Sequence, residues 1–195
     1  LQYPVDKAFG FSVATPDWAM YWDIREQPEA VEWFNHEMRQ YKGIIAAHNC
    51  SFDYRMSHSA GMFLHIDQLD DTVNRACQIN EHLMSYDLDS VAKKYLGAEK
   101  ESEMYEDLAK VFGGRATRNV QMKNIAKAEP KIVRPYAEKD ARLVLDLWRW
   151  QEKEIERQGL RSICDFERRT MPTIIRAEMR GVRVDTSVAE EAAHE

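Results

Sequence analysis

Cysteine is scarce in this chain of 195 residues, which contains only Cys50, Cys77 and Cys164, far apart in the sequence. The absence of a CxxC pair argues against a zinc site or a disulfide framework and fits a reducing cytoplasm. Long hydrophobic runs are also absent, and no stretch approaches the ~20 apolar residues of a membrane span. We therefore expect a cytoplasmic protein that does not bind membranes.

An excess of positive charge is missing as well. The formal net charge is −6, which argues against a protein that grips nucleic acid through a broad basic surface. It leaves room for a nuclease, because bound cations reverse the charge of an acidic metal site locally. With 44% apolar and 31% charged residues, the composition is that of a soluble globular protein, and the length suits one domain with room for the start of another.

Tyr136 and Asp140 are four residues apart in a segment that is apolar at helical spacing. Residues at positions i and i+4 lie on one face of a helix, so the phenol and the carboxylate are expected to project side by side. Such a pair suits metal-dependent hydrolysis, with the carboxylate holding a cation and the phenol orienting a water molecule. A half-buried tyrosine beside a solvated aspartate is the alternative.

A second polar pair follows the short apolar run 43–48, which predicts a buried strand. Asn49 and Asp53 stand where this strand gives way to a helix. Ligands gather at the carboxyl ends of strands in open α/β sheets, so a carboxylate one turn into the following helix can reach a metal there.

Together these motifs resemble a known family. Ala47-His48-Asn49-x-x-Phe52-Asp53 and, about 80 residues later, Tyr136-Ala137-Glu138-Lys139-Asp140-Ala141 are similar to the second and third motifs of the DEDDy 3′–5′ exonucleases. The closest resemblance is to the proofreading domain of family A DNA polymerases, particularly those of bacteriophages. It covers roughly residues 8–157 and implies a ribonuclease H-like α/β fold, a mixed sheet flanked by helices. It also implies that the protein acts in the cytoplasm of a bacterial host.

The chain departs from this family at the first motif. An Asp-x-Glu pair on an opening central strand is expected just before residue 1, beside predicted strands at 8–14 and 19–24. The chain begins with Leu1 and stops inside a helix-like run, so we expect an internal fragment, nearly inactive alone because it supplies two of the four acids.

The remaining elements follow from apolar spacing and turn residues. A further short strand is predicted at 64–69, and polar residues 98–131 predict a loop flanked by short helices. Helices are predicted at 28–38, at 88–96 with Asp87 or Ser85 as cap, around Tyr136 to about residue 157, and at 163–179.

The resemblance implies that residues 1–157 form the exonuclease domain and that 158–195 form a helical junction and the start of the polymerase domain. It implies two divalent cations, Mg²⁺ or Mn²⁺, with Asp140 and Asp53 as ligands, Tyr136 orienting water and Asn49 touching the terminal nucleotide. The implied partners are the 3′ end of single-stranded DNA and, through the polymerase domain, primer–template DNA. Two alternatives stay open: an RNA-trimming exonuclease of the same superfamily, and a catalytically dead structural domain beside a polymerase.

Overall fold

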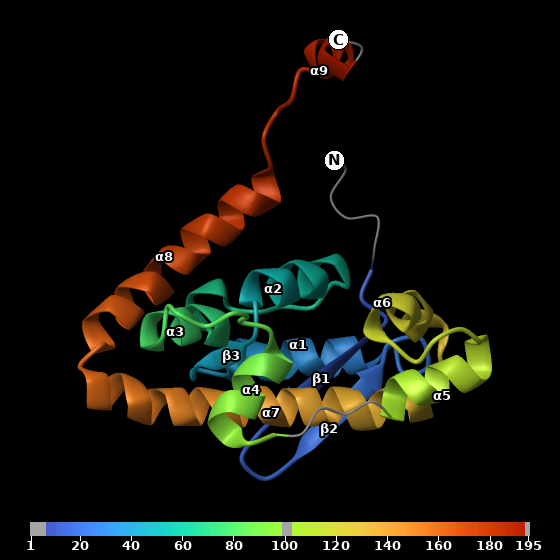
Figure 1. Ribbon diagram of the computed structural model, residues 1–195, viewed down its shortest axis with the longest axis horizontal. Coiled ribbons are helices and arrows are strands. Elements are labelled where there is room, and N and C mark those ends of the chain that lie inside the picture. The colour runs from blue at the N-terminus through green and yellow to red at the C-terminus, as the bar shows by residue number, and fades with distance from the viewer. Residues whose placement is uncertain (1–6, 99–102, 194–195) are drawn as a thin grey trace.

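The computed structural model describes residues 7–98 and 103–193, and in these parts helices outnumber strands (Figure 1). The strands form two separate two-stranded sheets, one antiparallel and one parallel. They are β1 (Gly10–Ala14), β2 (Ala19–Asp23), β3 (Ile45–Ala47) and β4 (Leu69–Asp71).

Strands β1 and β2 form a hairpin whose register pairs Gly10 with Asp23 and Ala14 with Ala19. The turn closes with the Thr15 amide donating to the Trp18 carbonyl at 2.8 Å. This confirms the two strands predicted at 8–14 and 19–24, each a little shorter than expected.

Strands β3 and β4 run parallel, with Ile45 beside Leu69 and Ala47 beside Asp71. β3 confirms the strand predicted at 43–48. The strand predicted at 64–69 is wrong, because residues Ile66–Gln68 form a single 3₁₀ turn, η1, and β4 begins only at Leu69.

Two helix ends lie where capping residues predict them. The Asp87 carboxylate accepts from the Ser90 amide at the start of α4, and Gly159 ends α7 in the left-handed conformation, with φ of 69°. The polar stretch 98–131 was predicted as a loop flanked by short helices, and in its described part a non-helical segment at 113–117 lies between short helical segments. The helical elements other than η1 are α1 (Ala30–Gln40), α2 (Cys50–Ser59), α3 (Thr72–Ile79), α4 (Leu88–Leu96), α5 (Glu103–Phe112), α6 (Arg118–Gln121), η2 (Met122–Lys127), α7 (Pro130–Gln158), α8 (Arg161–Arg180) and α9 (Thr186–Ala193).

Helix α7 is the central packing element and contacts the hairpin, β3, α3, α4, α5 and α8 (Figure 1). Leu147 and Ile155 are fully buried along it. Two polar contacts fix α7 on the hairpin: Glu138 accepts from the Tyr21 amide at 3.0 Å, and Arg142 donates to the Thr15 carbonyl at 2.6 Å. The helix that carries Tyr136 and Asp140 is therefore held at both sheets.

Helix α8 packs against strand β4 of the parallel sheet. Met171 and Ile175 are buried in one cluster with Cys50 of α2 and Leu69 of β4. A hydrogen bond from Ser51 to Glu178 adds a polar contact between α2 and α8. The first part of the predicted junction, residues 158–195, thus shares its core with the parallel sheet.

Candidate exonuclease site

The turn from β3 into α2 has an unusual backbone at Asn49. With φ of 69° and ψ of 57°, Asn49 is the one non-glycine residue with positive φ in the described parts of the chain. Asparagine tolerates this left-handed conformation better than most residues. The Asn49 side chain makes no capping hydrogen bond to α2.

The Asp71 carboxylate holds this turn from the neighbouring strand. It accepts hydrogen bonds from the amides of Asn49 at 3.0 Å and Cys50 at 2.8 Å, and from Val73 at 2.8 Å. Asp71 is only 6% exposed. The sequence analysis missed this contact, although an acid directly before a helix start is a signal for a buried cap.

Asp53 lies in the first turn of α2 and is exposed to solvent. Desolvation of its carboxylate, and next the negative charge of Asp71, raises the pKa of Asp53 to about 7. A bound cation would favour the ionised form of such a carboxylate.

Tyr136 and Asp140 share a face of α7, as their spacing predicts. Burial is the main reason that the pKa of Tyr136 is raised; the charge of Asp140, the nearby Tyr105, and hydrogen bonds to both add to it. The rings of Tyr105 and Tyr136 lie 6.2 Å apart. Tyr136 is consequently a protonated phenol at neutral pH, able to donate a hydrogen bond.

The four candidate residues form two pairs on different elements. Asn49 and Asp53 belong to the β3–α2 turn, and Tyr136 and Asp140 belong to α7, which packs on β3. The pairs are therefore carried by adjoining parts of the fold.

The comparisons with known proteins identify the family. Residues 17–156 match the 3′–5′ exonuclease model of the DNA polymerase A type. The chain belongs to this exonuclease family.

Three phage proteins named "DNA polymerase DpoZ" are similar over nearly the whole chain. The protein of Vibrio phage phiVC8 is 52% identical, with 98% of this chain and 32% of the relative covered. That of Salmonella phage PMBT28 is 44% identical, covering 97% and 30%, and that of Acinetobacter phage SH-Ab 15497 is 41% identical, covering 99% and 31%. This exonuclease chain spans about a third of the length of these relatives.

Membership confirms the predicted 3′–5′ exonuclease family and the α/β fold class. The match to the DNA polymerase A type of exonuclease also disfavours the first alternative, an RNA-trimming enzyme. In the described parts, no helix is long and apolar enough to cross a membrane.

Exonuclease domains of this family generally use divalent metals, and the oxygen donors of Asp53 and Asp140 suit Mg²⁺ or Mn²⁺ in type. Their number falls short, however. Within residues 7–98 and 103–193, no group of three or more His, Cys, Asp or Glu side chains is placed to hold a metal ion. The described residues thus offer a partial set of ligands.

Several basic residues near these motifs have structural partners. Arg142 binds the hairpin turn, and Lys131 pairs with Glu129 at 2.6 Å. The three cysteines are free, and Cys50 and Cys164 are buried, as expected of ordinary core residues.

Proposed function

We propose that the chain is the proofreading 3′–5′ exonuclease part of a longer phage DNA polymerase. Residues 1–157 would form the exonuclease domain, and 158–195 would lead into the polymerase domain. The names and lengths of the relatives support this proposal. The observation that carries it is that Asn49 and Asp53 directly follow β3 and that α7, the helix of Tyr136 and Asp140, packs on β3.

The substrate is the 3′ end of single-stranded DNA, delivered from primer–template DNA. Water attacks the terminal phosphodiester, the bond between phosphorus and the 3′ oxygen breaks, and the leaving oxygen takes up a proton. The products are a nucleoside 5′-monophosphate and a DNA strand with a new 3′ hydroxyl.

Each candidate residue has a distinct role in this reaction. Asp53 and Asp140 would contribute ligands to two divalent cations, which when bound supply activation of water and stabilisation of the leaving oxygen. Tyr136, a neutral phenol that can donate a hydrogen bond, orients the attacking water. Asn49, whose side chain is not used as a cap, contacts the terminal nucleotide.

Tyr136→Phe tests the role of the phenol. In the full-length protein, we expect the shortening of 5′-labelled single-stranded DNA from its 3′ end to slow about 10- to 100-fold, because only a water-orienting hydroxyl is lost. The matched control is Tyr41→Phe, which removes a hydroxyl that donates to the Ile44 carbonyl near the same sheet. A Tyr136→Phe rate equal to that of the control would contradict the proposed role.

The same assay separates the alternatives. A full-length wild-type protein that digests an RNA strand and leaves DNA intact would be an RNA-trimming enzyme. One that degrades neither strand with Mg²⁺ or Mn²⁺ present would be a structural domain.

A further inference from the structure

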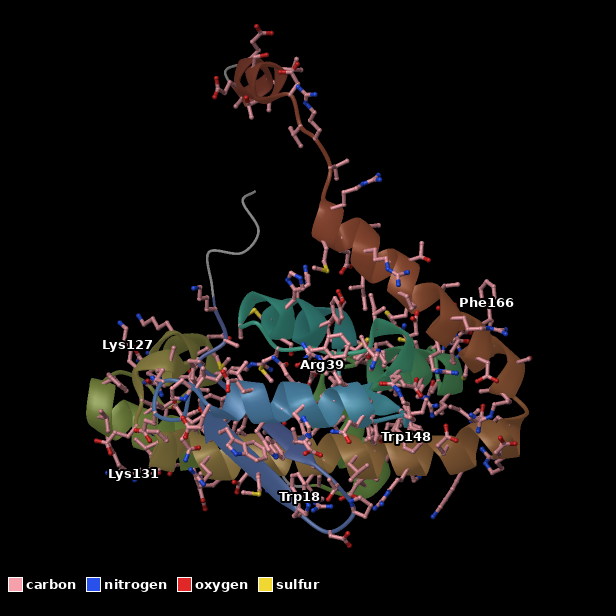
Figure 2. The ribbon with its side chains drawn as sticks, turned by 180° about the vertical axis from the view of Figure 1, so that it is seen from behind. Trp18, Arg39, Lys127, Lys131, Trp148 and Phe166 are labelled. Atoms are coloured by element: carbon pink, nitrogen blue, oxygen red, sulfur yellow. The ribbon has the colours of Figure 1, made fainter. Side chains whose placement is uncertain are left out.

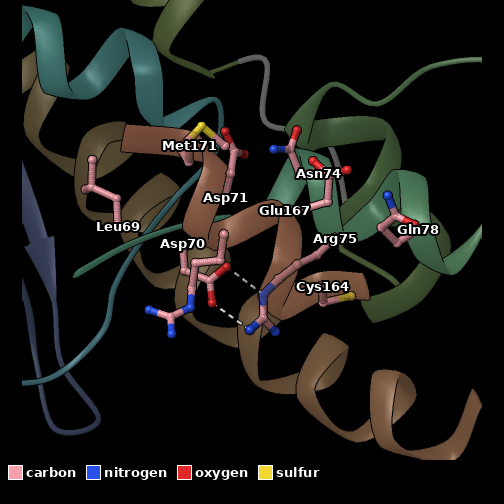
Figure 3. Close-up of a pocket in the computed structure, with 10 residues that line it drawn as sticks. Leu69, Asp70, Asp71, Asn74, Arg75, Gln78, Cys164, Glu167 and Met171 are labelled. Atoms are coloured by element: carbon pink, nitrogen blue, oxygen red, sulfur yellow. Dashed lines mark hydrogen bonds and ion pairs between the residues drawn. The ribbon is translucent and has the colours of Figure 1, made fainter. Parts of the chain in front are cut away.

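Three consecutive residues, Asp70, Asp71 and Thr72, connect the two candidate pairs. They lie at the end of β4 and the start of α3 and are all buried, with exposed fractions of 4%, 6% and 0%. Two buried acids in a row are costly to desolvate, so such a segment persists only where every oxygen has partners. Figure 3 shows both acids, with dashed lines marking the hydrogen bonds between Asp70 and Arg75.

Toward α2, Asp71 and Thr72 hold the turn that contains Asn49. Asp71 accepts from the amides of Asn49 and Cys50. Thr72 Oγ1 donates to the Ala47 carbonyl at 3.2 Å and lies 2.8 Å from His48 Nδ1. All four residues from 47 to 50 are thus hydrogen-bonded to residues 71 and 72.

Toward α7, Asp70 and Thr72 hold the helix of Tyr136 and Asp140. Trp148, labelled in Figure 2, donates from Nε1 to Asp70 at 2.9 Å, and Gln151 donates to the Thr72 carbonyl at 2.8 Å. Arg75 adds a bridge, with hydrogen bonds to Asp70 at 2.9 and 2.5 Å and an ion pair to Glu152 at 2.5 Å.

We propose that the 70–72 segment sets the distance and orientation between the two candidate pairs, with Asp71 as a positioning residue for exonuclease catalysis. Asp71 holds Asn49 in its left-handed conformation and thereby aims both Asn49 and Asp53. This inference rests on the proposed roles of those two residues. It identifies a residue that touches neither substrate nor metal and acts through the backbone of a turn.

A capping role alone does not account for Asp71. Only its hydrogen bond from the Val73 amide caps α3, while the other two come from a different element. Capping aspartates are commonly solvent-accessible, like Asp87 of α4, whereas Asp71 is buried. Its carboxylate is required because both oxygens accept; an asparagine would turn an NH₂ donor toward a backbone N–H.

The test uses Asp71→Asn in the full-length protein, with Asp87→Asn as matched control, since Asp87 caps α4 through the Ser90 amide. We expect hydrogen exchange at the Asn49 and Cys50 amides to accelerate at least about tenfold in Asp71→Asn alone. The exonuclease kcat should fall about 10- to 100-fold, as for other residues that orient metal ligands. The Mn²⁺ concentration for half-maximal activity should rise severalfold.

Faster exchange with a kcat within twofold of wild type would overturn the proposal, and so would unchanged exchange. If Asp71→Asn fails to fold, Thr72→Val replaces it. That variant keeps the side-chain shape and removes the contacts to Ala47 and His48, and a kcat within twofold of wild type would again refute positioning. Wild-type protein without exonuclease activity would overturn the proposed function itself, a result distinct from an active wild type with an active Asp71→Asn.

Discussion

Replacing Asp140 by alanine is expected to slow 3′–5′ exonuclease digestion on the order of 10³-fold, because a direct metal ligand is lost. Asp140 also touches Tyr136, so the same change removes the partner of the water-orienting phenol. The measurement is the release of mononucleotides from 5′-labelled single-stranded DNA by the full-length protein with Mn²⁺. DNA synthesis on a primed template, assayed in parallel, should stay unchanged.

Asp146→Ala is the matched control for this prediction. Asp146 lies on the same helix six residues further on, where the helical repeat turns it away from the Tyr136–Asp140 face. Its rate should stay within twofold of wild type. An Asp140→Ala protein that keeps more than about a third of the wild-type rate would contradict the assignment of Asp140 as a ligand.

Arg75→Met should lower the free energy of unfolding by about 3–5 kcal/mol, because it leaves a buried carboxylate without its charge partner. Arg75 is 5% exposed, donates twice to Asp70 and lies 5.1 Å from the centre of the Trp148 ring. Denaturation in urea, followed by tryptophan fluorescence, gives the free energy. In the Arg75→Met variant, the buried Asp70 carboxylate must either stay without its charge partner or take water into the core.

Two variants control for the loss of charge. Arg157→Met removes an exposed arginine paired with Glu154, and the free energy of unfolding should stay nearly unchanged because water screens this pair. Adding Asp70→Asn to Arg75→Met removes the orphaned negative charge and should recover part of the stability. Equal losses for Arg75→Met and Arg157→Met would show that the buried pair does not stabilise the fold.

Some features of the site are predictable from sequence because helix geometry alone determines them. Tyr136 and Asp140 share a face since they are four residues apart, and Asp53 lies one turn after Asn49 for the same reason. Strand β3 and the end of α7 at Gly159 are also local, because an apolar run and a left-handed glycine each carry their own signal.

Other features depend on contacts between distant segments. Strand β4 contains Asp70 and Asp71, and aspartate is depleted in strands, so propensity placed the strand too early. The acids are stable there because Arg75, Trp148 and the Asn49 turn supply their hydrogen bonds. None of these partners is adjacent in sequence to the carboxylate that it binds. The hydrogen bonds that Asp71 accepts from the Asn49 turn were therefore not predicted.

The central claim is that Asp53 on α2 and Asp140 on α7 serve one catalytic site, and a double-mutant cycle on the exonuclease rate tests it most directly. The variants are Asp53→Asn, Asp140→Asn and the two combined, with folding checked by circular dichroism. Residues that act as a unit are strongly non-additive, so the double variant should be no slower than the slower single variant, within about threefold. Losses that multiply would contradict the account, because they would mean that the two carboxylates act independently.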